Sequence, residues 1–76
     1  MRRRASDELT KNINLVFARK IKRLRQDNKL SQWGLSYYLG ISRYTYTNLE
    51  SGKSHFSLAL AVKLCLYFKI KEIKIE

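Results

Sequence analysis

The sequence contains no proline, one cysteine, one histidine and three glycines among its 76 residues. A single cysteine cannot form an intrachain disulfide, and one cysteine with one histidine is too small a set for a structural metal site, so we expect no metal and no cofactor. No apolar run is long enough to span a membrane, and no apolar segment follows the basic residues 2–4, which argues against a signal peptide. We therefore expect one small cytoplasmic domain that folds without cross-links.

Acidic residues are also few. Sixteen Lys and Arg against six Asp and Glu give a net charge of +10, and Glu50 is the only acidic residue between Asn28 and Lys71. These isolated carboxylates offer no acid–base pair and no nucleophile with its base, so we predict that the protein is not an enzyme. Basic domains of this size usually bind polyanions, which leaves nucleic acid or an anionic membrane surface as the partner.

The scarcity of helix breakers and the spacing of apolar residues predict a compact all-α fold of four to five helices. The expected helices span about residues 11–27, 32–39, 43–51 and 58–68. In the first of them the apolar positions Ile13, Val16, Phe17, Ile21 and Leu24 share one face. The last is apolar nearly all round, more than one buried stripe requires, so part of its surface must be covered.

The ends of these helices are marked by particular residues. Ser31, Ser42 and Ser57 are suited to be N-caps, and Gly40 can end the second helix in a left-handed conformation. Residues 1–10 are predicted to be a basic flexible arm or a frayed helix start, before a single domain over residues 11–76. The tail, residues 69–76, fits a short helix or a strand.

The order of cap, short helix, glycine turn, cap and helix is the layout of a helix-turn-helix. Residues 17–75 resemble the Cro/repressor type of helix-turn-helix domain, the xenobiotic-response-element family of bacterial and phage regulators. The resemblance is carried by IKRLRQDNKLSQ, the Leu35–Ser36 pair, LGIS at 39–42 and NLESGK at 48–53. It implies a lambda-repressor-like bundle with the motif at residues 32–51, a regulator of transcription that binds double-stranded DNA, and a recognition helix at about 43–51 in the major groove.

Side chains of the expected recognition helix divide between two faces. Tyr46 and Leu49, three apart, are predicted to face the core with Ile41. The outward face carries four candidates for DNA contact: Arg43, Tyr44, Thr47 and Asn48. Arginine can fork onto guanine and asparagine onto adenine, while threonine and tyrosine can pack on a thymine methyl group, or tyrosine can bind a phosphate.

Further roles are implied by the resemblance alone. Gln32 would contact a phosphate and brace the recognition helix, and Ser42 and Lys53 would be additional phosphate contacts. Arg25 stands where the family has an arginine that pairs with the glutamate at position 50, so Arg25 and Glu50 are predicted to form a structural ion pair. Three basic residues of the first helix, Arg19, Lys20 and Arg23, would add long-range attraction.

Two apolar surfaces remain open to interpretation. Trp33, Tyr37 and Tyr38 form an aromatic patch on the second helix, which either packs against the first helix and its basic side chains or contacts DNA backbone or protein. A candidate dimer interface on the fourth helix and tail consists of Leu60, Lys63, Leu66, Tyr67 and Ile70. The alternative is that the long first helix of the same chain covers these residues.

The leading interpretation is therefore a sequence-specific regulator that binds a palindromic operator as a two-fold homodimer. One alternative is a DNA-binding antitoxin, in which the aromatic patch or the apolar fourth helix holds a toxin as protein partner. Another is a membrane-surface binder, since the first helix is basic and amphipathic. RNA binding is less favoured because no sheet offers aromatic side chains for stacking.

Overall fold

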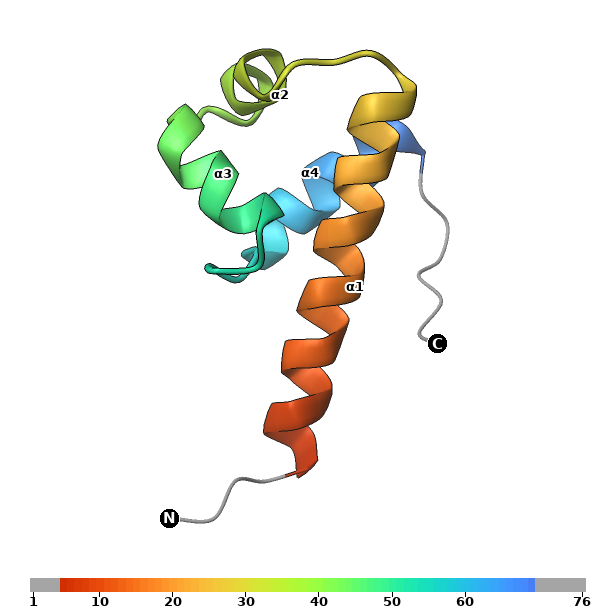
Figure 1. Ribbon diagram of the computed structural model, residues 1–76, viewed down its shortest axis with the longest axis vertical. Coiled ribbons are helices and arrows are strands. Elements are labelled where there is room, and N and C mark those ends of the chain that lie inside the picture. The colour runs from red at the N-terminus through yellow and green to blue at the C-terminus, as the bar shows by residue number, and fades with distance from the viewer. Residues whose placement is uncertain (1–4, 70–76) are drawn as a thin grey trace.

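The computed structural model describes residues 5–69, with side chains from Leu9 onward (Figure 1). Within this range it has four helices: α1 Ala5–Asp27, α2 Gln32–Leu39, α3 Arg43–Glu50 and α4 Leu58–Phe68. The short α2 and α3 lie together on one side of the long α1, and α4 runs from near the end of α3 to pass behind α1 (Figure 1). The prediction of an all-α bundle of the helix-turn-helix type is confirmed.

Helix α1 begins earlier than the sequence predicted. It starts at Ala5 rather than at about Lys11, so the part of the expected arm from residue 5 to residue 10 is helical. No proline or glycine interrupts this stretch, and Ala5, Glu8 and Leu9 are good helix formers, although the segment has no apolar period. The first turns extend past the other helices (Figure 1). Residues 1–4 and the tail from residue 70, with its helix or strand prediction, lie outside the described residues.

The predicted helix caps are confirmed. The side-chain oxygen of Ser31 accepts a hydrogen bond from the Gly34 amide, and Ser42 and Ser57 cap α3 and α4 in the same way. Each cap satisfies one of the amide groups that have no partner within the helix. At the other end of α2, Gly40 has φ +75° and its N–H donates to carbonyls of the preceding turn. These local signals set the short turn between α2 and α3.

The core lies where the four helices meet. Its buried apolar cluster contains Phe17, Ile21, Leu35, Leu39, Tyr46 and Leu64. The buried stripe of α1 differs in part from the predicted one, because Asn14 and Ala18 are buried while Ile13 is 38% exposed. Cys65 is partly buried against this cluster, where it packs as a small apolar side chain.

Candidate nucleic-acid interface

Helix α3 has one buried face and one exposed face. Tyr46, Leu49 and Glu50 are buried, with Tyr46 completely inaccessible to solvent. Arg43, Tyr44 and Thr47 are exposed, and Tyr44 is 77% exposed. The predicted division of this helix by face is therefore present, and three of the four candidate base-contacting side chains lie on the open side. Asn48 is half-buried at the boundary.

The buried face contains a two-point ion pair. Arg25 Nε lies 2.8 Å from Glu50 Oε2, and Arg25 Nη2 lies 3.0 Å from Glu50 Oε1. The third nitrogen of the guanidinium, Nη1, donates to the Leu30 carbonyl oxygen at 2.9 Å. One arginine of α1 thus binds both α3 and the segment that leads into α2, a geometry that the planar guanidinium fork favours.

Glu50 accepts two further hydrogen bonds. The Tyr46 hydroxyl donates to Oε2, and Gln32 Nε2 donates to Oε1 at 3.0 Å. Gln32 Oε1 in turn accepts from the Thr47 hydroxyl at 3.2 Å. Gln32, the first residue of α2, therefore links the buried carboxylate to the exposed face of α3, which is the bracing contact that the resemblance implied. Among the buried side-chain polar atoms described, none lacks a hydrogen-bond partner.

This network perturbs three ionisable groups. Burial by itself raises the pKa of the Glu50 carboxyl, but hydrogen bonds from Arg25, Tyr46 and Gln32 outweigh burial and hold that pKa below its usual value. Burial and the hydrogen bond to Glu50 raise the pKa of the Tyr46 hydroxyl, and the hydrogen bond to Glu50 raises the pKa of Arg25. Glu50 is therefore a paired anion at neutral pH.

The remaining predicted phosphate contacts lie at the two ends of α3. Ser42 Oγ accepts from the Thr45 amide at 3.0 Å and donates to the Thr45 hydroxyl at 2.9 Å, so this side chain caps the helix. Lys53 is exposed in the loop after α3, and its backbone N–H donates to the Asn48 carbonyl oxygen at 2.9 Å. Both residues thus flank the open face of α3.

The aromatic patch of α2 divides into two parts. Tyr38 packs on Tyr67 of α4 with ring centroids 4.6 Å apart, and the ammonium of Lys63 lies 5.3 Å from the centroid of Tyr38. Trp33 and Tyr37 stay 68% and 87% exposed. The interpretation that the whole patch packs against α1 is therefore wrong. Trp33 instead lines a shallow groove with Arg43, Tyr44 and Thr47 of α3.

The residues of the candidate dimer interface lie in different environments. Leu60 is partly buried against the core, and Lys63 and Tyr67 contact the aromatic ring of α2. Leu66 is 73% exposed, and Ile70 lies outside the described residues. The open stripe of α4 consists of Leu58, Val62 and Leu66, spaced four residues apart. Only Leu66 of the predicted set belongs to that stripe.

Asn14 is a structural residue that the sequence interpretation missed. It is buried in α1, its side-chain amide donates to the Ser54 carbonyl oxygen, and its side-chain oxygen accepts from the Phe56 amide. These bonds attach the loop after α3, which contains Lys53, to α1. A polar residue three and seven positions before the apolar Phe17 and Ile21 was the available signal, because such spacing puts it on their face.

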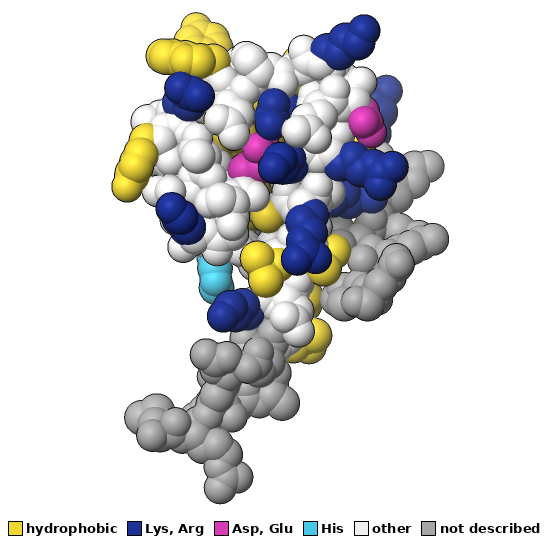
Figure 2. Space-filling view, in the orientation of Figure 1, with side chains coloured by type: hydrophobic (Ala, Val, Ile, Leu, Met, Phe, Trp, Pro, Cys, Tyr) yellow, Lys and Arg dark blue, Asp and Glu magenta, His cyan; other side chains and the backbone are white. Residues whose placement is uncertain are grey.

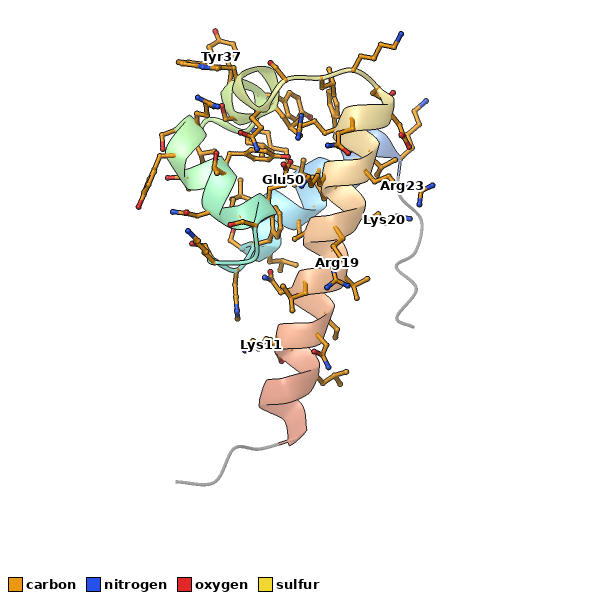
Figure 3. All side chains as sticks on the ribbon, viewed as in Figure 1. Lys11, Arg19, Lys20, Arg23, Tyr37 and Glu50 are labelled. Carbon is orange, nitrogen blue, oxygen red and sulfur yellow. The ribbon has the colours of Figure 1, made fainter. Side chains whose placement is uncertain are left out.

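The surface around α3 is strongly basic. Lys and Arg side chains spread over the face in view, with little acidic surface among them (Figure 2). Within residues 9–69 the acidic side chains are Asp27 and Glu50, and Glu50 is neutralised by Arg25. Lys20 and Arg23 project from the side of α1 away from α3 in this view (Figure 3). Their contribution near α3 is therefore to the general field of the protein.

Two features are absent from the part of the chain that the structure describes. No group of three or more His, Cys, Asp or Glu side chains there could hold a metal ion. None of the helices α1 to α4 has both the length and the apolar character needed to cross a membrane.

Comparison with known protein families agrees with this geometry. The helix-turn-helix family model of the Cro/repressor type matches residues 21–75, which include α2, α3 and α4. The chain belongs to this helix-turn-helix family, and it is in general terms a DNA-binding regulator of transcription. The family is typically non-enzymatic. Neither the curated proteins nor the solved structures gave a significant match.

Proposed function

We propose that the protein is a sequence-specific regulator that inserts α3 into the major groove of double-stranded DNA. The observation that carries this proposal is that α3 has a buried face and an open face. Because Tyr46, Leu49 and Glu50 fix the helix, the open face can present Arg43, Tyr44 and Thr47 in a constant geometry. A recognition element that is ordered before binding loses little conformational entropy when it meets its target.

The chemistry of the open face suits base recognition. Arg43 can donate two parallel hydrogen bonds to guanine O6 and N7, and Asn48, although half-buried, is the candidate for adenine. The exposed ring of Tyr44 offers both an apolar face and a hydroxyl. We assign these side chains to base readout, and Gln32, Ser42 and Lys53 to the sugar–phosphate backbone, which sets position rather than sequence.

The charge distribution supports binding to a polyanion. The chain carries a net charge of +10, and the only carboxylate on α3 is compensated by Arg25. DNA approaching α3 therefore meets no uncompensated negative charge from this helix. If each subunit neutralises about four to six phosphates, the affinity falls steeply with salt concentration, with a logarithmic slope close to the number of phosphates contacted.

We further propose that the protein binds as a two-fold homodimer through α4. Leu58, Val62 and Leu66 expose apolar surface along one stripe, and the stripe borders an apolar cleft between α1 and α4 that Ile13 and Phe17 also line. Burial of such a stripe against its own copy would remove apolar area from water. Sedimentation should therefore detect dimers at micromolar concentration, and Leu66→Lys should shift them to monomers. A wild-type monomer, alone and on DNA, would exclude the dimer.

The test of the whole proposal is selection of bound duplexes from a random pool at fixed salt. Two-fold binding predicts a palindrome whose half-sites are about 10 base pairs apart, one turn of DNA. Equal recovery of all sequences would show that the protein does not recognise a specific operator. Recovery of a single half-site without its symmetric copy would support base readout and exclude the dimer.

A further inference from the structure

The groove between α2 and α3 exposes two large aromatic side chains. It is lined by Trp33 from α2 and by Arg43, Tyr44 and Thr47 from α3. Trp33 is 68% exposed and Tyr44 is 77% exposed, although burial of either ring would remove a large apolar area from water. Exposed aromatic rings beside a binding surface commonly mark a contact site.

The two sides of this groove are held in fixed relation. The caps at Ser31 and Ser42 set the first turns of α2 and α3, from which Trp33 and Tyr44 project. The hydrogen bond from Thr47, in the second turn of α3, to Gln32, at the start of α2, joins the two helices. The backbone positions from which the two rings project are thus set by the fold before any ligand enters the groove.

The groove combines apolar surface with positive charge. The rings of Trp33 and Tyr44 and the methyl group of Thr47 are apolar, Arg43 is cationic, and none of the four lining residues is acidic. In the major groove the apolar group on a base edge is the 5-methyl group of thymine, or of cytosine when cytosine is methylated. A guanine on the adjacent pair supplies the two acceptors that Arg43 can take.

We infer that Trp33 and Tyr44 together hold a pyrimidine 5-methyl group, next to the base pair that Arg43 contacts. This inference rests on the proposed function, and it adds α2 to the elements that read sequence. Trp33 directly follows Gln32 at the start of α2, so it lies beside the residue assigned to the backbone. The DNA base that it contacts is then at the edge of the half-site nearest to α2.

Tyr37 provides a matched control. It lies one helical turn after Trp33 on α2, it is 87% exposed, and it is not part of the groove lining. Figure 3 shows Tyr37 on α2 at the top of the view, away from Glu50. Removal of this aromatic ring therefore changes the exposed aromatic area without changing the groove.

The experiment uses the full chain and the duplex recovered by selection. Each thymine of the half-site is replaced singly by deoxyuridine, which removes only the methyl group. We expect one position at which the replacement weakens binding about fourfold, the change expected when one methyl group is no longer buried. Trp33→Ala should bind the thymine and uracil duplexes equally, whereas Tyr37→Ala should keep the fourfold preference.

Two further duplexes separate the sources of the methyl group. At the sensitive position, cytosine and 5-methylcytosine are compared opposite guanine. If the methyl group alone is held, 5-methylcytosine should bind about fourfold more tightly than cytosine in the wild type, and equally in Trp33→Ala. Recognition of thymine but not of 5-methylcytosine would restrict the ligand to thymine and keep the role of Trp33.

Trp33 is the only tryptophan of the chain, so its fluorescence reports on the groove directly. Emission should change on addition of the thymine duplex and change less with the uracil duplex. Circular dichroism and urea unfolding of both variants establish that each is folded. We expect both to be as stable as the wild type, because Trp33 and Tyr37 are exposed.

The outcomes distinguish this inference from the proposal on which it rests. If selection recovers no preferred sequence, the proposed function fails. If a preferred sequence exists but Trp33→Ala keeps the wild-type preference for thymine over uracil at every position, the inference about the groove is overturned and the function stands. The inference about the groove would also be overturned if Trp33 bound a protein partner and Trp33→Ala left the preference for DNA sequences unaltered.

Discussion

The two faces of α3 differ in how their polar groups are satisfied. On the inner face, Glu50 binds Arg25, Tyr46 and Gln32, and every one of these bonds lies within the protein. On the outer face, Arg43 and Tyr44 extend into solvent. Eight residues therefore contain both a fixed polar centre and a surface available to a ligand. A helix can combine both because adjacent positions lie about 100° apart around its axis.

This difference separates stability from recognition. A buried polar group that loses its partner keeps the cost of its desolvation, so substitutions on the inner face should mainly affect folding. An exposed group loses little on truncation in the free protein, so substitutions on the outer face should mainly affect binding. Each of the following experiments tests whether substitutions on one face change stability or change binding.

The largest effect is expected for Arg25→Met, which removes the ion pair and leaves Glu50 buried. Glu50 and Arg25 side chains are 4% and 13% exposed. We expect a loss of about 2–4 kcal/mol in the free energy of unfolding, measured by urea denaturation. The matched control is Arg23→Met, because Arg23 and Asp27 are 85% and 66% exposed and 3.9 Å apart. That control should change stability by less than about 0.5 kcal/mol; equal losses in both would contradict the comparison.

Next in size is Arg43→Ala on the outer face. It should cost about 1–3 kcal/mol of binding at one base pair and relax specificity there, with unfolding unchanged. Measurement of affinities for all single-base variants of the selected duplex locates that pair. Lys53→Ala serves as the contrast, because loss of a phosphate contact should weaken all sequences alike and lower the salt slope by about one. If Arg43→Ala instead weakened binding to all sequences equally, Arg43 would be a phosphate contact and not a base contact.

A smaller effect is expected when one hydroxyl is removed from each face. Tyr46→Phe keeps the core volume but leaves Glu50 with one donor fewer, so it should lower the free energy of unfolding by about 1 kcal/mol. Tyr44→Phe, two residues earlier and 77% exposed, should leave unfolding unchanged. If both variants were as stable as the wild type, the hydrogen bond from Tyr46 would contribute nothing to folding.

The smallest effect concerns acid, because burial and hydrogen bonding shift the Glu50 pKa in opposite directions. The pKa of Glu50 in the folded protein lies below its ordinary value of 4.5. Its ionised form therefore stabilises the fold above the unfolded-state pKa, and this contribution disappears as the pH falls through the folded pKa. Urea unfolding from pH 6 down to pH 2 should show a steeper loss of stability for the wild type than for Glu50→Gln. Parallel curves would exclude Glu50 as a source of acid sensitivity.

Features with local causes were predictable from the sequence. The N-caps at Ser31, Ser42 and Ser57 follow from a short side chain that can accept an amide hydrogen bond, and the left-handed Gly40 follows from the absence of a Cβ. The exact start of α1 was not predictable, because charged residues without an apolar period leave helix and coil close in free energy. Its extension to Ala5 was found only in the structure.

Some features of the site were predictable from residue spacing, and others only from resemblance to a family. Tyr46 and Leu49 were assigned to the core from their spacing, while the contact between Arg25 and Glu50, 25 residues apart, was implied by resemblance to a family and by no local pattern. The sequence did not show which residues pack against Trp33 or against the apolar stripe of α4. Both lie on elements with apolar side chains on more than one face, and spacing alone does not tell which face a neighbouring helix covers.

The order of helices, their caps and the excess of positive charge are properties of the chain, because each depends on neighbouring residues or on composition. Tertiary structure decided which polar atoms are satisfied and which are open. It brought Gln32 between Glu50 and Thr47, and it put Trp33 beside Tyr44 on a second helix. Such pairings join residues that are distant in sequence, and they form only when the packing of α1, α2 and α3 fixes their separation.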